Sequence, residues 1–169
     1  MRMTTGLGIL TGLAFVGEPA NATTTTQQFQ VQLTIQAECV IRSTATLNFG
    51  TLGVLGGAGG TTNNDATTTV AVQCTNTTPY DIGLDAGTTS GGSTTTRRLV
   101  GSGSSATVQY KLYTDPTHAT NWGNAVGVDT ASKTGNGASQ SYTIYGRIPP
   151  QTTPAPDTYS DTVTVTVTY

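Results

Sequence analysis

The chain has few charged residues. Only 9% of its 169 residues are Asp, Glu, Lys or Arg, and the formal net charge is −2 at pH 7. Proteins that bind nucleic acid carry a basic patch. These charges are too few and too dispersed to form one, so the composition argues against a nucleic-acid partner.

Residues that favour helices are also scarce. Leu, Lys, Glu and Met are uncommon, and no window of about eleven residues keeps apolar positions at the spacing of a helical face. Thr, Gly and Ser dominate instead, and Val and Tyr supply much of the apolar content. Thr, Val and Tyr suit a pleated, half-buried surface, whereas Gly and Ser suit turns. We therefore expect an all-β domain.

Recognisable catalytic and metal-binding patterns are missing. The single His, His118, lies near Asp115, but the chain has no nucleophile-elbow sequence G-x-S-x-G. The acidic residues form no D-x-D-x-D-G calcium loop, and no third metal ligand lies near either Cys. We predict no catalytic residue, no cofactor and no metal site, and we interpret His118 as a solvated loop residue.

The chain has no hydrophobic run long enough for a membrane span. Its one apolar run, residues 7–16, has about half of the roughly twenty residues that a bilayer requires. Arg2 precedes this run, and Ala20-Asn21-Ala22 follows it as an A-x-A cleavage site. We predict that residues 1–22 are a secretory signal peptide, which leaves 169 − 22 = 147 residues, enough for one domain.

Only two cysteines are present, Cys39 and Cys74. In an oxidising compartment, a cysteine pair in a small β domain is usually a disulfide. Closing the loop between them would stabilise the fold by roughly 3 to 4 kcal/mol. We predict a structural disulfide between Cys39 and Cys74.

Short alternating or apolar runs, separated by turn residues, predict seven or so strands without intervening helices. Such a pattern indicates a Greek-key sandwich or barrel. Trp122, the only Trp, is expected to pack its indole against this sandwich. The expected strands cover residues 29–41, 46–50, 67–74, 80–85, 98–100, 107–113, 139–148 and 162–169.

The last strand alternates without interruption to the end of the sequence. Val163, Val165, Val167 and Tyr169 face one side, and threonines occupy the positions between them. No Pro or Lys blunts this strand, although a long, flat edge strand invites pairing with another chain. Either the strand is central in its sheet, or something pairs with it.

A second one-faced segment precedes Cys39. It consists of alternating apolar and polar residues, and burying its four large apolar side chains would contribute about 6 to 12 kcal/mol before ordering costs. If it lies beside the terminal strand of a neighbouring chain, β-augmentation explains both segments. Periodicity alone favours the alternative, in which the first and last strands pair within one closed sandwich. The apolar residues are Phe29, Val31, Leu33 and Ile35.

Several short motifs, in this order along the chain, resemble the spore coat protein U domain family, which is found in subunits of archaic, Csu-type chaperone–usher pili. The resemblance covers nearly all of the chain after residue 22. Its pieces are Gln36-Ala37 with Cys39, Leu47-Asn48-Phe49-Gly50, Val72-Gln73-Cys74-Thr75-Asn76, Pro79-Tyr80, Leu84-Asp85-Ala86-Gly87, Tyr110-Lys111-Leu112-Tyr113-Thr114-Asp115, Trp122-Gly123, Tyr145-Gly146-Arg147-Ile148-Pro149 and Tyr159-Ser160-Asp161 before the terminal Thr/Val run.

The resemblance implies an incomplete immunoglobulin-like β-sandwich that lacks its last strand and is completed by donor-strand complementation. Residues 23–36 become a donor-strand extension, and residues 37–169 become the sandwich domain. Phe29, Val31, Leu33 and Ile35 become donor residues, whereas Val163, Val165, Val167 and Tyr169 belong to the acceptor edge strand. Cys39 and Cys74 become the family's disulfide.

The resemblance also implies a function. The chain is expected to be a non-enzymatic subunit of a surface pilus, or fimbria, that supports adhesion and biofilm formation. Its partners are expected to be identical or related subunits, a periplasmic chaperone and an outer-membrane usher, on a route through the periplasm to the cell surface. A secreted coat protein with the same fold remains an alternative, as does a secreted carbohydrate-binding or hydrolytic β-sandwich.

Overall fold

The computed structural model describes residue 17 and residues 21–169. The chain divides into two units, and the boundary falls between Thr34 and Ile35. In the first unit, the described residues contain no helix or strand. Most of the expected signal peptide, residues 1–22, lies outside the described residues.

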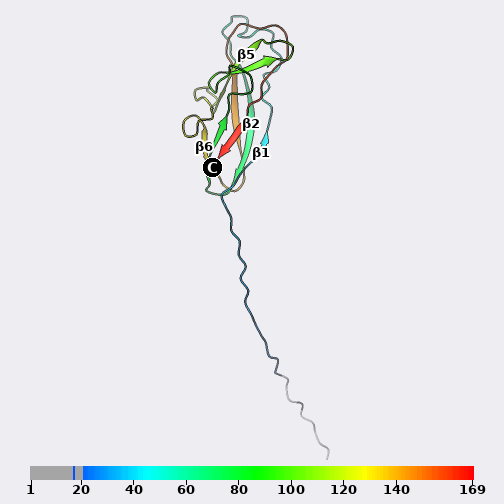
Figure 1. Ribbon diagram of the computed structural model, residues 1–169, viewed down its shortest axis with the longest axis vertical. Helices are drawn as coiled ribbons and strands as arrows, with labels where there is room; N and C mark the ends of the chain where they lie inside the picture. Colours follow the sequence, from blue (N-terminus) through cyan, green and yellow to red (C-terminus); the bar gives the residue numbers. More distant parts are fainter. Residues whose placement is uncertain (1–16, 18–20) are drawn as a thin grey trace, which may run out of the picture. The chain divides into compact units, whose positions relative to one another are not determined.

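The second unit contains nine strands in two antiparallel sheets, and the described residues contain no helix (Figure 1). Consequently, none of the described segments is a helix that could cross a membrane. One sheet has the order β1-β2-β7-β5-β4-β8 and the other has the order β6-β3-β9. The strands are β1 (Cys39–Thr44), β2 (Asn64–Cys74), β3 (Pro79–Leu84), β4 (Arg97–Gly101), β5 (Thr107–Tyr113), β6 (Ala131–Thr134), β7 (Ser139–Ile148), β8 (Tyr159–Ser160) and β9 (Val165–Thr168).

This arrangement confirms the prediction of an all-β sandwich. The long strands β2 and β7 pair from Asn64 opposite Ile148 to Gln73 opposite Ser139. Their alternate residues turn inward and meet those of β3 and β5. The apolar core includes Val70, Val72, Tyr80, Ile82, Leu84, Val108, Tyr110, Leu112, Trp122, Ile144 and Ile148.

Trp122 packs into this core as expected. Its side chain is almost completely buried, and its indole Nε1–H donates a hydrogen bond of 2.7 Å to the carbonyl of Ile82. The indole therefore fills core volume without leaving its polar hydrogen unpaired.

The predicted disulfide is present and joins Cys39 of β1 to Cys74 of β2. The two residues lie opposite each other in the β1–β2 ladder. Just before β1, the carbonyl of Glu38 accepts a hydrogen bond of 2.9 Å from the Thr75 amide, which extends the pairing by one residue. The chain is thus fixed to the sandwich from Glu38 onward.

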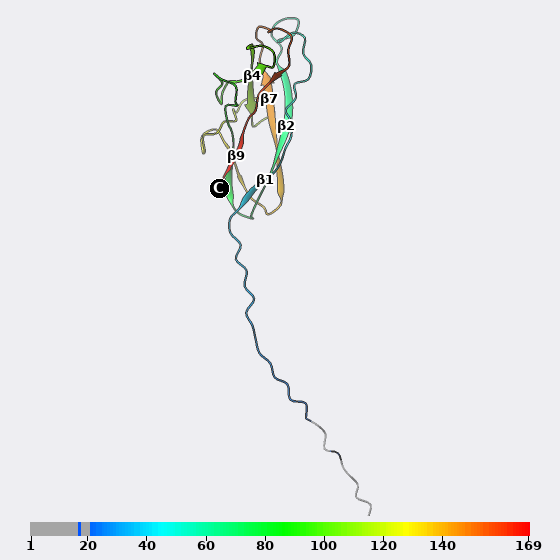
Figure 2. The same cartoon turned by 45° about the vertical axis from the view of Figure 1, so that its right-hand side comes forward.

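The terminal run differs from the single strand expected over residues 162–169. Tyr159 and Ser160 form β8 and pair with β4, whereas β9 begins at Val165 and pairs with β3 in the other sheet. The residues between β8 and β9 cross from one sheet to the other. Figure 2 shows β4 and β9 in the same view.

Two other expected strands are shorter or absent. Residues 29–38 are not in a strand, and regular pairing begins at Cys39. Residues 46–50 also form no strand, and they end in a local turn. In that turn the Asn48 side chain accepts a hydrogen bond from the Gly50 amide, and Gly50 has a φ of 76°.

The expectation of a solvated His118 is wrong. Only 7% of its side chain is exposed, and its ring packs edge-on between Tyr113 and Tyr145, with centroid distances of 5.1 and 6.2 Å. Its Nε2 lies 3.8 Å from the Asp65 carboxylate, which pairs with Arg147 at 2.7 Å. The loop folds back over the outer face of the sheet and carries the ring with it.

The disulfide should contribute substantially to the stability of this sandwich. Replacing both cysteines, Cys39→Ser with Cys74→Ser, should lower the free energy of unfolding by roughly 3 to 4 kcal/mol, because the bond closes a loop with a sequence separation of 35. Urea unfolding of the full chain measures this loss. Reduced wild-type protein is the control and should match the variant, whereas a midpoint equal to that of the oxidised protein would contradict the prediction.

Candidate functional site

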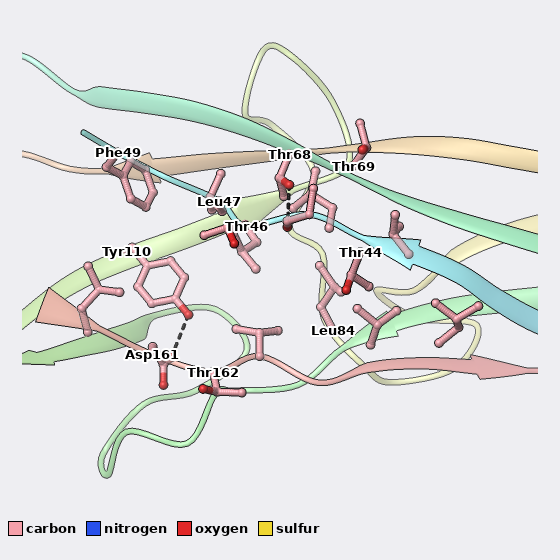
Figure 3. Close-up of a pocket in the computed structure, with 18 residues that line it drawn as sticks. Thr44, Thr46, Leu47, Phe49, Thr68, Thr69, Leu84, Tyr110, Asp161 and Thr162 are labelled. Atoms are coloured by element: carbon pink, nitrogen blue, oxygen red, sulfur yellow. Dashed lines mark hydrogen bonds between the residues drawn. The ribbon is translucent and has the colours of Figure 1, made fainter.

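An open groove of about 460 Å³ lies beside the terminal run (Figure 3). It is bordered by two segments that are far apart in the sequence. One wall is formed by β1 and the residues that follow it, namely Ile41, Thr44, Ala45, Thr46, Leu47 and Phe49. The other wall is formed by the residues that lead into β9, namely Asp161, Thr162, Val163 and Val165.

The floor of the groove is the hydrophobic core itself. It exposes inward-facing side chains of β2, β4, β5 and β7, together with the last residue of β3. Apolar surface that remains open to water is a source of binding free energy for whatever covers it. The apolar floor residues are Val70, Leu84, Leu99, Tyr110, Leu112 and Ile144.

The groove also lies between two strand edges that lack a partner among residues 21–169. β1 pairs only with β2, and β9 pairs only with β3. In the residues before β9, the carbonyls of Thr162 and Thr164 accept hydrogen bonds from Thr88 and Asp85. Because alternate residues of an extended chain direct their backbone groups to opposite edges, those of Val163 and Val165 face the groove. An added strand would find both apolar surface and free backbone groups there.

One end of the groove is polar. Asp161 occupies an inward position of the alternating run, where its carboxylate accepts a hydrogen bond of 2.7 Å from the hydroxyl of buried Tyr110. Burial and this hydrogen bond raise the pKa of Tyr110 well above its usual range, so the hydroxyl remains a donor. The other Asp161 oxygen accepts hydrogen bonds from the amides of Thr88 and Thr89, both at 3.0 Å. Asp161 therefore anchors the wall where it leaves β8.

Asp85 anchors the same wall further along the chain, at Thr164. Its carboxylate accepts hydrogen bonds of 2.9 Å from the amides of Thr164 and Gly87. Burial acts to raise the pKa of Asp85, but these hydrogen bonds and the charge of Arg97 outweigh it and hold the pKa below its usual range. The ionised carboxylate thus replaces a strand partner for residues that belong to neither sheet.

Arg97 supports the floor from below. Its side chain is completely buried, and its guanidinium donates hydrogen bonds of 2.6 to 2.9 Å to four backbone carbonyls. Desolvation lowers the pKa of Arg97, and nearby carboxylates, including that of Asp85, oppose this shift. The carbonyls belong to Leu84, Asp85, Thr94 and Trp122, so the arginine fixes the end of β3 where it meets the groove.

The structure places the predicted acceptor residues in different environments. Val163 and Val165 line the groove. Val167 is half-buried against the core, whereas Tyr169 is 60% exposed. Sequence reasoning assigned no role to Asp161 or Tyr110. The available signal was a carboxylate in an inward position of an otherwise apolar alternation.

The predicted donor residues are strongly exposed. Phe29, Val31 and Leu33 belong to the first unit, and their side chains are 86%, 83% and 82% exposed. Ile35, at the start of the second unit, is 76% exposed. Four large apolar side chains at alternating positions are thus left in contact with water.

Comparison with known proteins finds a matching family model and a solved structure of similar fold. The family model described as Spore Coat Protein U domain matches residues 25–166. A solved structure that resembles the chain is the crystal structure of the CsuC–CsuE chaperone–tip adhesion subunit pre-assembly complex from archaic chaperone–usher Csu pili of Acinetobacter baumannii. The TM-score is 0.55 at 23% identity over 80% of this chain, and the match spans 40% of that chain. A search of curated proteins found no match.

The stability of the fold should depend on pH through Asp85, which anchors the groove wall. A carboxylate whose pKa is depressed in the folded state stabilises the fold above its unfolded pKa, near 3.8, and loses this contribution as pH falls through the folded value. Thermal unfolding from pH 6 downward should therefore show a smaller acid-induced loss for Asp85→Asn than for wild type. Glu38→Gln is the control, because it removes an exposed carboxylate that accepts no hydrogen bond from any described residue. Equal pH profiles for wild type and Asp85→Asn would contradict the prediction.

Proposed function

The chain belongs to the Spore Coat Protein U domain family, and on this premise we propose that it is a structural subunit of a chaperone–usher surface pilus. In this proposal, subunits polymerise by donor-strand exchange, and the fibre serves adhesion and biofilm formation. One pair of observations carries it. An apolar groove lies between two strand edges that have no partner in the described part of the chain, and an exposed segment with four alternating apolar residues precedes the sandwich.

The two features are complementary in chemistry. The groove offers apolar floor residues and the backbone groups of Val163 and Val165, which an extended segment can satisfy by β-augmentation. Residues 23–36 offer such a segment. Burying Phe29, Val31, Leu33 and Ile35 would contribute about 6 to 12 kcal/mol before the cost of ordering the segment. This favours stable joints between subunits.

The connection between the segment and β1 favours a neighbouring chain over the same chain as acceptor. To enter its own groove beside β1, the segment would have to reverse direction between Ile35 and Cys39. Glu38 is already held in line with β1 by Thr75, which leaves Gln36 and Ala37 for the turn. Tight hairpin turns need residues that tolerate positive φ, chiefly Gly and Asn, and neither Gln nor Ala does so readily.

The proposal assigns partners and a route. Residues 1–22 are removed as a signal peptide, residues 23–36 are the donor extension, and residues 37–169 are the acceptor sandwich. A periplasmic chaperone covers the groove before assembly, an outer-membrane usher exchanges it for the next subunit, and the fibre reaches the cell surface. The role is structural and requires no catalysis. Similarity in fold to a chain of a chaperone–subunit complex supports the chaperone step.

A coat assembly that uses the same joint is the alternative within the family. Deleting the usher gene distinguishes the two, because fibres require it and a secreted coat does not. The proposal predicts that surface material disappears in the deletion strain while the subunit accumulates with its chaperone.

The polymer should survive detergent. Unheated electrophoresis of surface-sheared material should show a ladder of multimers resistant to sodium dodecyl sulfate, because each joint buries a complete strand. Boiling should collapse the ladder to monomer. Monomer alone in the unheated lanes would overturn the polymer.

Charge on the donor face should block assembly. Val31→Asp with Leu33→Asp places two carboxylates in the apolar groove, where burying unpaired charges costs several kcal/mol. The ladder should be lost, while the subunit remains folded in its chaperone complex. The matched control, Gln30→Asp with Gln32→Asp, adds the same charges to the opposite face and should keep the ladder. Normal fibres from the first variant would refute the assigned donor.

A further inference from the structure

A second concave surface lies on the outer face of the larger sheet, away from the groove. It has a volume of about 540 Å³ and is formed by β4, the start of β5 and two loops. Its lining contains one cation, one apolar side chain and six hydroxyl groups. These residues are Arg98, Val100, Thr88, Thr89, Ser90, Ser104, Ser105 and Thr107.

Arg98 is the cation of this pocket, and its charge is not neutralised within the described residues. The Nε atom is buried and has no hydrogen-bond partner. No carboxylate in the described part of the chain forms an ion pair with Arg98. Its neighbour Arg97 points into the core and donates hydrogen bonds to four carbonyls. The two adjacent arginines therefore differ, because the Arg98 guanidinium has no acceptor among the described residues. The two terminal nitrogens of Arg98 also have no hydrogen bond to a described residue, so an acceptor bound in the pocket can pair with them end-on.

The hydroxyl groups of the pocket fall into two sets. Those of Thr88 and Thr89 donate to Asp161, and that of Ser104 donates to Asp157, so these three oxygens can offer only acceptor lone pairs. Hydrogen bonds from Gly103 and Ser102 lower the pKa of Asp157 to about 2, which keeps it an acceptor. The second set is Ser90, Ser105 and Thr107, whose hydroxyls have no hydrogen bond to any described residue and can donate or accept.

We propose that this pocket binds a saccharide that carries a carboxylate, with the acid on Arg98 and the sugar hydroxyls on the Ser and Thr side chains. The planar guanidinium matches a carboxylate in two parallel hydrogen bonds. Sugar hydroxyls can donate to Thr88, Thr89 and Ser104, and they can accept from the free hydroxyls. A uronic acid residue supplies both kinds of group.

The hydrogen-bonding capacity of these hydroxyls disfavours a simple anion as the ligand. Phosphate or sulfate accepts hydrogen bonds at nearly all of its oxygens, so it would place negative charge against the acceptor-only oxygens of Thr88, Thr89 and Ser104. A neutral sugar would satisfy the hydroxyls but would leave Arg98 without an acceptor. A sugar unit that carries one acid and several hydroxyls supplies partners both for Arg98 and for the hydroxyl groups of the lining.

The test is an NMR titration of the backbone amides of the full chain with trigalacturonic acid. Shifts should concentrate at residues 88–90, 98 and 104–107. The fully methyl-esterified trisaccharide keeps every hydroxyl and masks every carboxylate, and its dissociation constant should be about tenfold higher or more. Arg98→Gln should weaken binding of the acid to a similar degree, and Arg98→Lys should fall between Gln and wild type.

Arg42→Gln is the matched control, because it removes one positive charge outside this pocket and should change the dissociation constant by less than about twofold. Thermal unfolding of each variant verifies that it folds. The proposal is overturned if the methyl ester binds as well as the acid, or if Arg98→Gln and Arg98→Lys both bind like wild type. It is equally overturned if inorganic phosphate at the same concentration gives the same shifts, or if no shifts occur at the pocket.

Discussion

Among residues 21–169, the terminal strand β9 is hydrogen-bonded along one edge only, and the arrangement of the groove follows from this constraint. Its pairing with β3 fixes the position of the strand but leaves the opposite backbone edge and the side chains of Val163 and Val165 facing the groove. On the other side of the groove, β1 is also an edge strand, and its one partner among the described strands is β2. A sandwich with two such edges side by side exposes part of its core until a further strand is added.

A polar network holds this unfinished region in shape. Asp161 and Asp85 fasten the residues between β8 and β9 to the loop after β3, and Arg97 fastens the end of β3 from inside the molecule. Ionic and hydrogen-bonded contacts suit this task because they fix direction, whereas apolar contacts alone are not directional. The wall is therefore ordered without an added strand, so a donor strand of the kind proposed would bind at a smaller entropic cost.

Local patterns in the sequence were sufficient where a strand has partners on both sides. The alternation in residues 67–74, 107–113 and 139–148 predicted β2, β5 and β7, which are central in their sheet. The same alternation in residues 29–35 and 162–164 did not produce strands in the structure, because a strand also requires a hydrogen-bonding neighbour. Composition also could not predict the buried positions of Arg97 and His118. Both depend on partners that only the fold brings near, four carbonyls in one case and two tyrosines in the other.

The disulfide lies at the first residue of β1, directly after the exposed segment. In a fibre joined through that segment, tension would enter each sandwich at Cys39. The covalent bond would pass the load to Cys74 at the end of β2, the strand that pairs with both β1 and β7. Pulling would then load the long β2–β7 ladder along its length, so that many hydrogen bonds share the force, instead of peeling β1 away one bond at a time. In such a fibre, the bond would therefore carry mechanical load in addition to stabilising the fold.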